Sequence, residues 1–159
     1  MEIKSSAFSN GEKIPRKYTC EGDSISPPLS FSDVPSDSKS LALIMFDPDI
    51  PQEFKDKLNI PGWDHWSVWN ISSSTLELGE GAVPTGSVQG NHTRGKIGYA
   101  PPCPPKDKEP PKHRYEFTLY ALDTELDLKE GATRQELLDA MEDHILEKAE
   151  LMGMYEKEA

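Results

Sequence analysis

The sequence has no long hydrophobic run and no excess of basic residues. Its longest uninterrupted apolar segment, Leu41 to Phe46, contains six residues, whereas a helix that crosses a bilayer needs roughly 18. The 17 Lys and Arg residues are outnumbered by 28 Asp and Glu residues, which gives a net charge of −11. Such a surface repels the phosphates of nucleic acids and of anionic lipids. We therefore expect no nucleic acid partner and no membrane span.

Cysteine is scarce, and the N-terminus lacks a secretory signal. Glu2 is acidic and no apolar stretch follows it, so we expect a cytoplasmic protein. Cys20 and Cys103 are too few for a disulfide scaffold or a spaced metal site, and the sequence favours two reduced thiols. If the two cysteines meet, a disulfide would close a long loop, worth about 4.5 kcal/mol in the chain-entropy model.

The 14 prolines among 159 residues are spread along the chain, which is unfavourable for a helical bundle because proline interrupts helices. One domain covering residues 1–159 and built from short strands is expected. The apolar run from Ser40 to Phe46 predicts a central strand buried on both faces. Aromatic and β-branched residues predict two more strands, from His65 to Ser72 and from Arg114 to Leu122.

Helical periodicity is confined to two segments. Between Thr133 and Met152 the apolar residues fall on one helical face, Thr133 and Glu136 fit a capping box, and Gly153 occupies the position of a C-terminal cap. This pattern predicts one long C-terminal helix that covers a sheet. A second, short helix is expected near Gln52 to Leu58.

Two segments predict loops. The segment from Gly79 to Gly95 contains five glycines and no periodicity, so we expect an exposed loop. The proline-rich segment from Pro101 to Pro111 favours an extended, polyproline-like conformation.

The familiar catalytic signatures are missing: the chain has no GxSxG elbow, no Walker loop, no GxGxxG and no HExxH. Polar residues instead gather where the predicted strands begin or end. If those ends converge, they form one small pocket walled by Trp66 and the proline-rich segment. The alternative is a set of separate surface residues, with the two aspartates acting as turn formers. The residues concerned are Asp47, Asp49, His65, His113 and Tyr115.

Five motifs in order resemble the phosphatidylethanolamine-binding protein family, also called Raf kinase inhibitor-like proteins, in its prokaryotic branch. The resemblance extends over nearly the whole chain, through Tyr18 to Gly22 near one end and Gly131 to Thr133 near the other. The motifs are Asp47-Pro48-Asp49-Ile50-Pro51, His65-Trp66, Gly98-Tyr99, Pro102-Cys103-Pro104-Pro105 and His113-Arg114-Tyr115.

The resemblance implies a mainly β, two-sheet Greek-key fold with a few short helices and one C-terminal helix. It also implies an anion pocket for phosphate or a phospholipid headgroup, lined by the five polar residues above and by the backbone N–H of Cys103. Tyr99 and Pro102 would support the pocket wall. The chain departs from the family pattern at Ala100-Pro101, where two glycines are usual. Because proline has no N–H, one backbone contact to the anion is in doubt.

The residue types suggest how such a pocket would hold an anion. Histidine, the Tyr115 hydroxyl and backbone N–H groups are the available donors. The carboxylates would accept an imidazole N–H, so that the protonated ring presents its second N–H to the ligand. This predicts anion binding that strengthens as pH falls through about 6.5. Strand alternation turns Arg114 away from His113, so we expect it to form an ion pair with Asp47 or Asp49. By the same rule Trp66 favours core packing.

The leading interpretation is a non-enzymatic binding or regulatory protein without a cofactor, which recognises phosphate, phosphoethanolamine or a phosphorylated protein and regulates a kinase pathway. The first alternative is a serine-protease inhibitor acting through an exposed loop, either Pro101 to Lys112 or Gly79 to Gly95. The second is a hydrolase, metal-dependent or acid–base, built on the same Asp and His residues. The resemblance also admits a homodimer.

Overall fold

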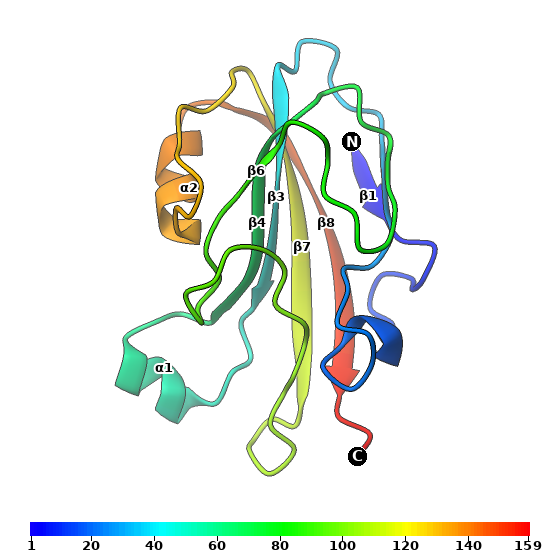
Figure 1. Ribbon diagram of the computed structural model, residues 1–159, viewed down its shortest axis with the longest axis vertical. Helices are drawn as coiled ribbons and strands as arrows, with labels where there is room; N and C mark the ends of the chain where they lie inside the picture. The colour runs from blue at the N-terminus through cyan, green and yellow to red at the C-terminus, as the bar shows by residue number, and fades with distance from the viewer.

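The computed structural model describes all residues, 1–159, and contains two antiparallel β-sheets (Figure 1). The larger sheet has the strand order β6-β4-β3-β7-β8 and the smaller one β1-β2-β5. The larger sheet consists of β3 (Ser40–Asp47), β4 (Trp63–Ile71), β6 (Val88–Gln89), β7 (Lys112–Leu122) and β8 (Ile145–Glu156). The smaller sheet consists of β1 (Glu2–Lys4), β2 (Leu29–Ser32) and β5 (Glu77–Leu78).

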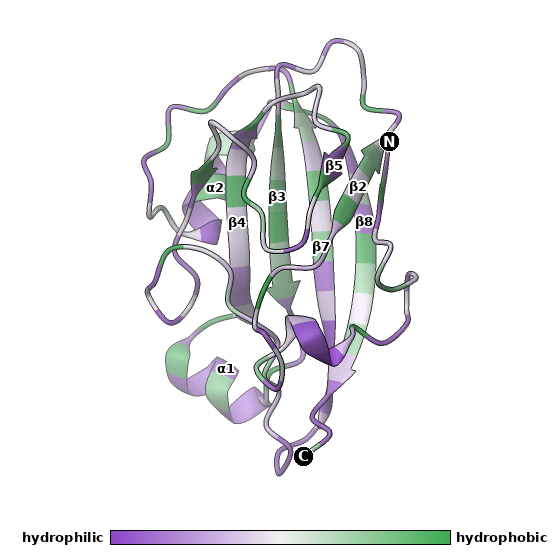
Figure 2. Cartoon of the chain, turned by 45° about the vertical axis from the view of Figure 1, so that its right-hand side comes forward, coloured by the Kyte–Doolittle hydropathy of each residue, from purple (hydrophilic) through white to green (hydrophobic).

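The central strand β3 is buried on both faces, as its apolar run predicts. Leu41, Leu43 and Met45 face the small sheet and join the main core. Ala42 and Ile44 face the opposite side, where helix α2 (Arg134–Met141) covers a second, smaller core. Figure 2 shows the small sheet in front of the large one and α2 behind it, with β3 apolar along its length. The fold is therefore mainly β, with two sheets, as expected.

The helices are few and short. The predicted helix near Gln52 to Leu58 is confirmed as α1 (Gln52–Leu58), and a single 3-10 turn, η1, covers Arg16–Tyr18. None of these elements is long and apolar enough to cross a membrane.

The prediction of one long C-terminal helix is wrong. The capping box at Thr133 is present, but α2 ends at Met141. The backbone turns at Asp143, whose φ is +69°, and the chain continues as strand β8, which pairs with β7 along eleven residue pairs. Pairing with the otherwise free edge of β7 satisfies the backbone of this segment, and this tertiary interaction outweighs its helical periodicity.

Gly153 shows why the segment must be a strand. Leu151, Gly153 and Tyr155 alternate onto the buried face of β8. A Cβ at Gly153 would lie 2.5 Å from the side chain of Ile14 and 2.8 Å from that of Phe8. The glycine is therefore required by close packing of the N-terminal segment against β8, and not by a helix cap.

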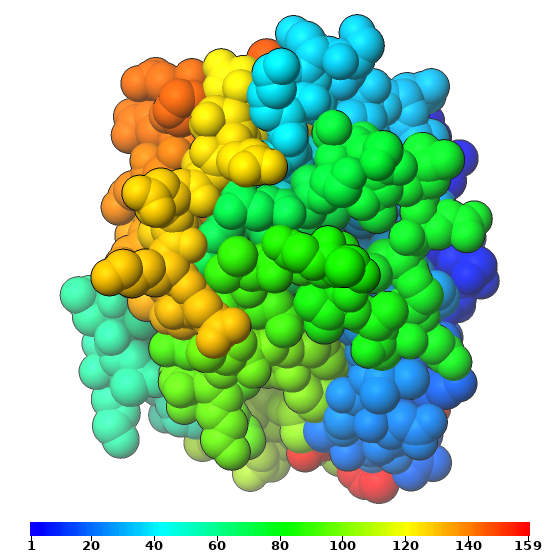
Figure 3. Space-filling view, turned by 45° about the horizontal axis from the view of Figure 1, so that its top comes forward, coloured from blue at the N-terminus to red at the C-terminus, as the bar shows by residue number.

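The glycine-rich segment, residues 79–95, is mostly loop and runs across the face that Figure 3 brings forward (green). It is not exposed throughout, because it contains the short strand β6 and the buried Gly90. A Cβ at Gly90 would lie 2.3 Å from the carbonyl oxygen of Ala132, so this position is pinned against the segment that precedes α2.

Strand direction brings the candidate residues together. Because β3 is antiparallel to both β4 and β7, the end of β3 lies beside the beginnings of its two neighbours (Figure 1). Asp47 is paired with Trp63, and Phe46 with Glu116. A β-bulge interrupts β4 here: Trp66 and Asp64 have partners on β3, and His65 between them has none. Bulges of this kind turn a side chain out of its regular direction.

Candidate functional site

A cavity of about 670 Å³ lies at this end of the large sheet. Its floor is formed by Asp47 of β3, His65 of β4, and His113 and Tyr115 of β7. The four residues come from three adjacent strands, and each is at most 5% exposed. The convergence of strand ends that the sequence suggests is therefore present, and the reading as separate surface residues does not hold for these four.

His113 is held rigidly in the pocket wall. Its Nδ1 lies 2.7 Å from Asp47 Oδ2, and its Nε2 lies 2.9 Å from the carbonyl oxygen of Pro110. The other oxygen of Asp47 accepts the backbone N–H of Asp49 at 2.7 Å. Both ring nitrogens thus lie against acceptors. No ring N–H is left for a ligand, which differs from the donor role expected of His113.

Tyr115 carries an unpartnered hydroxyl. The side chain is 0% exposed, and its oxygen has no hydrogen-bond partner in the protein. The ring lies between two histidines: edge-on to His65, with centroids 5.2 Å apart, and stacked on His113 at 6.3 Å. Burial, together with the charge of Asp47, raises the pKa of Tyr115. The group is therefore a neutral O–H donor, and burying it unpaired costs about 1–3 kcal/mol.

His65 is oriented by the backbone of Ala100. Its Nδ1 lies 2.7 Å from the Ala100 carbonyl oxygen, and the Ala100 N–H donates to the His65 carbonyl oxygen at 2.8 Å. Burial lowers the pKa of His65 from 6.5 to about 4, because desolvation penalises the imidazolium. The ring is therefore neutral at pH 7. This corrects the expectation of a charged donor with a pKa near 6.5.

Ala100 and Pro101 are accommodated without strain but offer the cavity no free backbone N–H. The Ala100 N–H is bonded to His65, and Pro101 has none. Ala100 is absent from the residues with positive φ, so the conformation suits alanine. At this departure from the family pattern, residues 100 and 101 therefore have no backbone N–H that could bind an anion.

Asp49 does not line the cavity. Its carboxylate accepts the Arg114 backbone N–H at 2.8 Å and the guanidinium Nε and Nη2 at 2.9 and 2.8 Å. Arg114 thereby lowers the pKa of Asp49. The ion pair expected for Arg114 is formed with Asp49, on the outer side of β7. These two residues fix the end of β3 against β7, and Asp47 is the aspartate that lines the cavity.

The expected wall residues are partly replaced by neighbours. Trp66 packs in the main core, where its indole N–H donates to Gln89 at 2.8 Å, and Trp63 lines the cavity instead. Tyr99 lines the cavity, while its hydroxyl donates to the Tyr18 carbonyl oxygen at 2.8 Å. Pro102 is buried outside the lining, which contains Pro101, Pro104 and Pro105.

A basic rim and an apolar side were not expected from the sequence. His92 and Arg94 of the glycine-rich segment and Lys96, which directly follows it, line the cavity, and Arg94 and Lys96 are exposed at its mouth. Asp47, already bonded to His113, is the only carboxylate in the lining, so the pocket is locally positive in a chain of net charge −11. The cluster of basic residues within HTRGK is the signal that could have indicated this rim. The apolar side is formed by Ile50, Pro51, Phe54 and Trp63.

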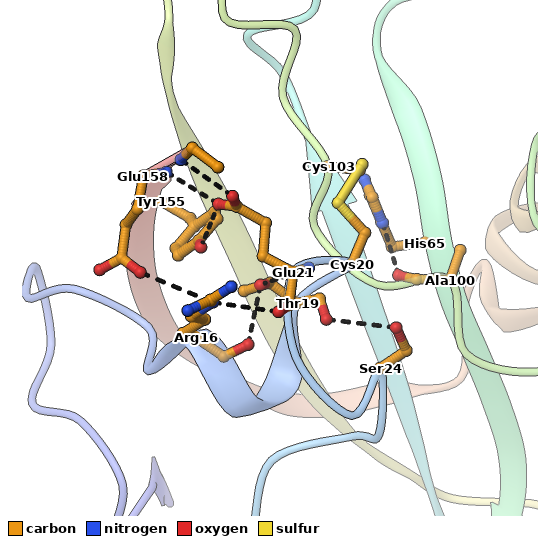
Figure 4. Close-up of a disulfide and its surroundings, with 11 residues drawn as sticks. Arg16, Thr19, Cys20, Glu21, Ser24, His65, Ala100, Cys103, Tyr155 and Glu158 are labelled. Carbon is orange, nitrogen blue, oxygen red and sulfur yellow. Dashed lines mark hydrogen bonds and ion pairs between the residues drawn. A yellow bond between two sulfur atoms is a disulfide. The ribbon is translucent and has the colours of Figure 1, made fainter.

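Cys20 and Cys103 form a disulfide, so the preference for two reduced thiols is wrong. Their Cα atoms are 5.4 Å apart although 83 residues separate them in sequence. The Cys20 N–H donates to the Pro102 carbonyl oxygen at 3.0 Å, which places the two segments side by side. Both cysteines line the cavity, and Figure 4 shows the bond next to the ring of His65. The disulfide thus ties the turn after η1 to the proline-rich wall.

The residues do not form a metal centre. The structure contains no group of three or more His, Cys, Asp or Glu side chains that could hold a metal ion. The two Asp and two His residues of the hydrolase alternative do not converge, because Asp49 is bonded to Arg114 outside the cavity.

Comparison with known proteins agrees with this geometry. A family model described as phosphatidylethanolamine-binding protein matches residues 4–156. The chain belongs to the phosphatidylethanolamine-binding protein family. A protein of Chlamydia muridarum called UPF0098 protein is 54% identical, over 99% of this chain and 100% of its own length. Another of that name, from Methanothermobacter thermautotrophicus, is 46% identical over 99% of each chain.

Solved structures of family members share the whole fold. The homolog CT736 of Chlamydia trachomatis has 52% identity and a TM-score of 0.91, with 99% of this chain and 97% of the other covered. Escherichia coli YbcL, described as a member of the mammalian family, has 29% identity and a TM-score of 0.86, with 99% and 98% covered. The family's two-sheet architecture therefore extends over the whole of this chain.

Proposed function

We propose that this member of the phosphatidylethanolamine-binding protein family is a binding protein whose pocket recognises a phosphate group, either free or as a monoester such as phosphoethanolamine. The observation that carries the proposal is the hydroxyl of Tyr115, which is fully buried and unpartnered on a residue that lines the cavity. An unpaired buried donor is costly, and an oxyanion in the cavity would satisfy it. Recognition of a phosphorylated protein would use the same chemistry.

Local charge supports an anionic ligand. Arg94 and Lys96 stand at the mouth, and neither forms an ion pair within the protein. The one carboxylate in the lining is held by His113 at 2.7 Å. Positive charge at the mouth of a low-dielectric cleft raises the local concentration of anions, which offsets the repulsion from the acidic remainder of the surface.

The size of the cavity favours a phosphate attached to a larger group. About 670 Å³ lies within the range of sites that bind small organic molecules, roughly 300–1,000 Å³. The apolar side chains of Ile50, Phe54 and Trp63 line part of this space. A substituent on the phosphate would lie against them.

The alternative of protease inhibition has less support. An inhibitory loop must be exposed, but in the first candidate Pro102 and Pro104 are buried and Pro105 lines the cavity, which leaves the segment from Lys106 to Lys112 as its mostly exposed part. In the other candidate, Gly90 is pinned against Ala132. Titration of trypsin and chymotrypsin with the protein measures this activity directly, and we expect no inhibition.

Isothermal titration calorimetry with inorganic phosphate and with phosphoethanolamine tests the proposal. We expect Tyr115→Phe to weaken binding about 10- to 100-fold, because a hydrogen bond to a charged group contributes about 1.5–3 kcal/mol. The matched control is Tyr120→Phe, which lies on the same strand but packs against the second core; its affinity should equal that of the wild type. Equal affinities of Tyr115→Phe and wild type, or no binding to wild type, would contradict the proposal.

A further inference from the structure

We propose that the pocket selects oxyanions that carry a proton, such as hydrogen phosphate or a singly protonated phosphate monoester, over oxyanions without one, such as sulfate. The inference rests on the proposed function and concerns the ligand class of the same site. Its basis is the pairing of His65 with Ala100, which determines whether the pocket presents a donor or an acceptor.

The hydrogen bond to Ala100 fixes the histidine tautomer. A carbonyl oxygen only accepts, so Nδ1, 2.7 Å away, carries the proton. In the neutral ring Nε2 then presents a lone pair. Figure 4 shows this nitrogen on the edge of the ring turned away from Ala100, and His65 is part of the cavity lining. The residues that line the cavity therefore include an unpaired acceptor, His65 Nε2, and an unpaired donor, the Tyr115 hydroxyl.

The combined effect of the groups around His65 disfavours protonation of its ring. Asp47 of β3 attracts a proton to the ring, but that carboxylate is already bonded to His113 of β7. His92 on the rim and His113 both oppose a charge on His65, and desolvation outweighs all of these effects. Arg94 and Lys96 add positive charge at the mouth, and Tyr115 is neutral. The disulfide beside the ring does not titrate.

The two ligand classes meet this floor differently. A hydrogen phosphate donates its O–H to His65 Nε2 and accepts from the Tyr115 hydroxyl, and no proton enters from solution. Sulfate has only acceptors, so one of its oxygens would face a lone pair unless His65 takes up a proton. With a pKa of about 4, that protonation disfavours sulfate up to about a thousandfold at pH 7. Sites built around a ligand O–H reject analogues that lack it for the same reason.

Calorimetry of the full chain at pH 7 with three anions tests this inference. The probes are inorganic phosphate, which carries at least one proton at this pH, and fluorophosphate and sulfate, which are dianions of the same shape without a proton. Each titration is run in two buffers of different ionisation enthalpy, so that proton uptake is measured. We expect phosphate to bind at least tenfold tighter than the other two, without proton uptake.

The outcomes separate the inference from the function on which it rests. Equal affinities for the three anions, with one proton taken up, would overturn the inference and leave the phosphate site intact. Binding of none of them would overturn both. A second measurement needs no variant: sulfate affinity should rise about tenfold for each pH unit between 7 and 5, in parallel with the protonated fraction of His65. His65→Gln should lose the preference for phosphate, whereas His92→Gln on the rim should keep it.

Discussion

Acid should destabilise the protein through His65, and the effect can be calculated. The ordinary pKa of histidine is 6.5, and burial lowers the pKa of His65 in the folded protein to about 4. Between these two pH values the unfolded chain binds a proton at this ring, and the folded chain does not. The stability contributed by the neutral ring is therefore present above 6.5 and is lost as pH falls toward 4. Linkage gives a loss of about 2 kcal/mol at pH 5 and about 3 kcal/mol at pH 4.

Urea unfolding of wild type and His65→Gln at several pH values between 4 and 7 isolates this contribution. Carboxylates titrate in both proteins, so their effects cancel in the difference between the two free energies of unfolding. Gln keeps an amide donor for the Ala100 carbonyl. His92→Gln at the rim is the comparison and should show a smaller change with pH, because burial lowers the pKa of His92 less than that of His65. The difference between wild type and His65→Gln should shift by about 2 kcal/mol between pH 7 and pH 5. A difference that stays constant with pH would refute the reasoning about His65.

Three further predictions concern stability. In urea unfolding, Tyr115→Phe should leave the free energy of unfolding unchanged or raise it by about 1 kcal/mol, because the Tyr115 hydroxyl is unpaired. Tyr99→Phe should lower it by about 1 kcal/mol, because the Tyr99 hydroxyl donates to the Tyr18 carbonyl oxygen. Gly153→Ala should cost about 1–3 kcal/mol by thermal unfolding, because the added carbon meets the N-terminal segment at 2.5 Å. Reducing the disulfide should cost up to about 4.5 kcal/mol in denaturant unfolding, and thiol titration of unreduced, denatured protein should find no free thiol.

The strands that form the site could be predicted from local patterns. The apolar run from Ser40 and the aromatic run ending at Leu122 each appear as strands within two residues of their predicted starts. The candidate residues at their ends meet because antiparallel pairing brings the end of β3 beside the beginnings of β4 and β7. Residue type and position in the sequence were sufficient to predict that Asp47, His65 and Tyr115 line one pocket.

Features that depend on distant partners could not be predicted. The segment after Met141 satisfies both helical and strand periodicity at its apolar positions, and the free edge of β7 decides between them. The tautomer of His65 is set by a carbonyl 35 residues away. Asp49 and Asp47 are two residues apart in one motif, but Arg114 binds only the former. In each case the deciding group is remote in sequence and close in space.

A phosphate titration of ¹⁵N-histidine-labelled protein, followed by long-range ¹H–¹⁵N NMR at pH 7, tests the central claim most directly. The resonance of His65 Nε2 should move saturably with phosphate while keeping the shift of an unprotonated, hydrogen-bonded nitrogen, and the resonances of His144, outside the pocket, should not move. Tyr115→Phe should move the midpoint to at least tenfold higher phosphate. An unchanged His65 spectrum at tens of millimolar phosphate would contradict the account.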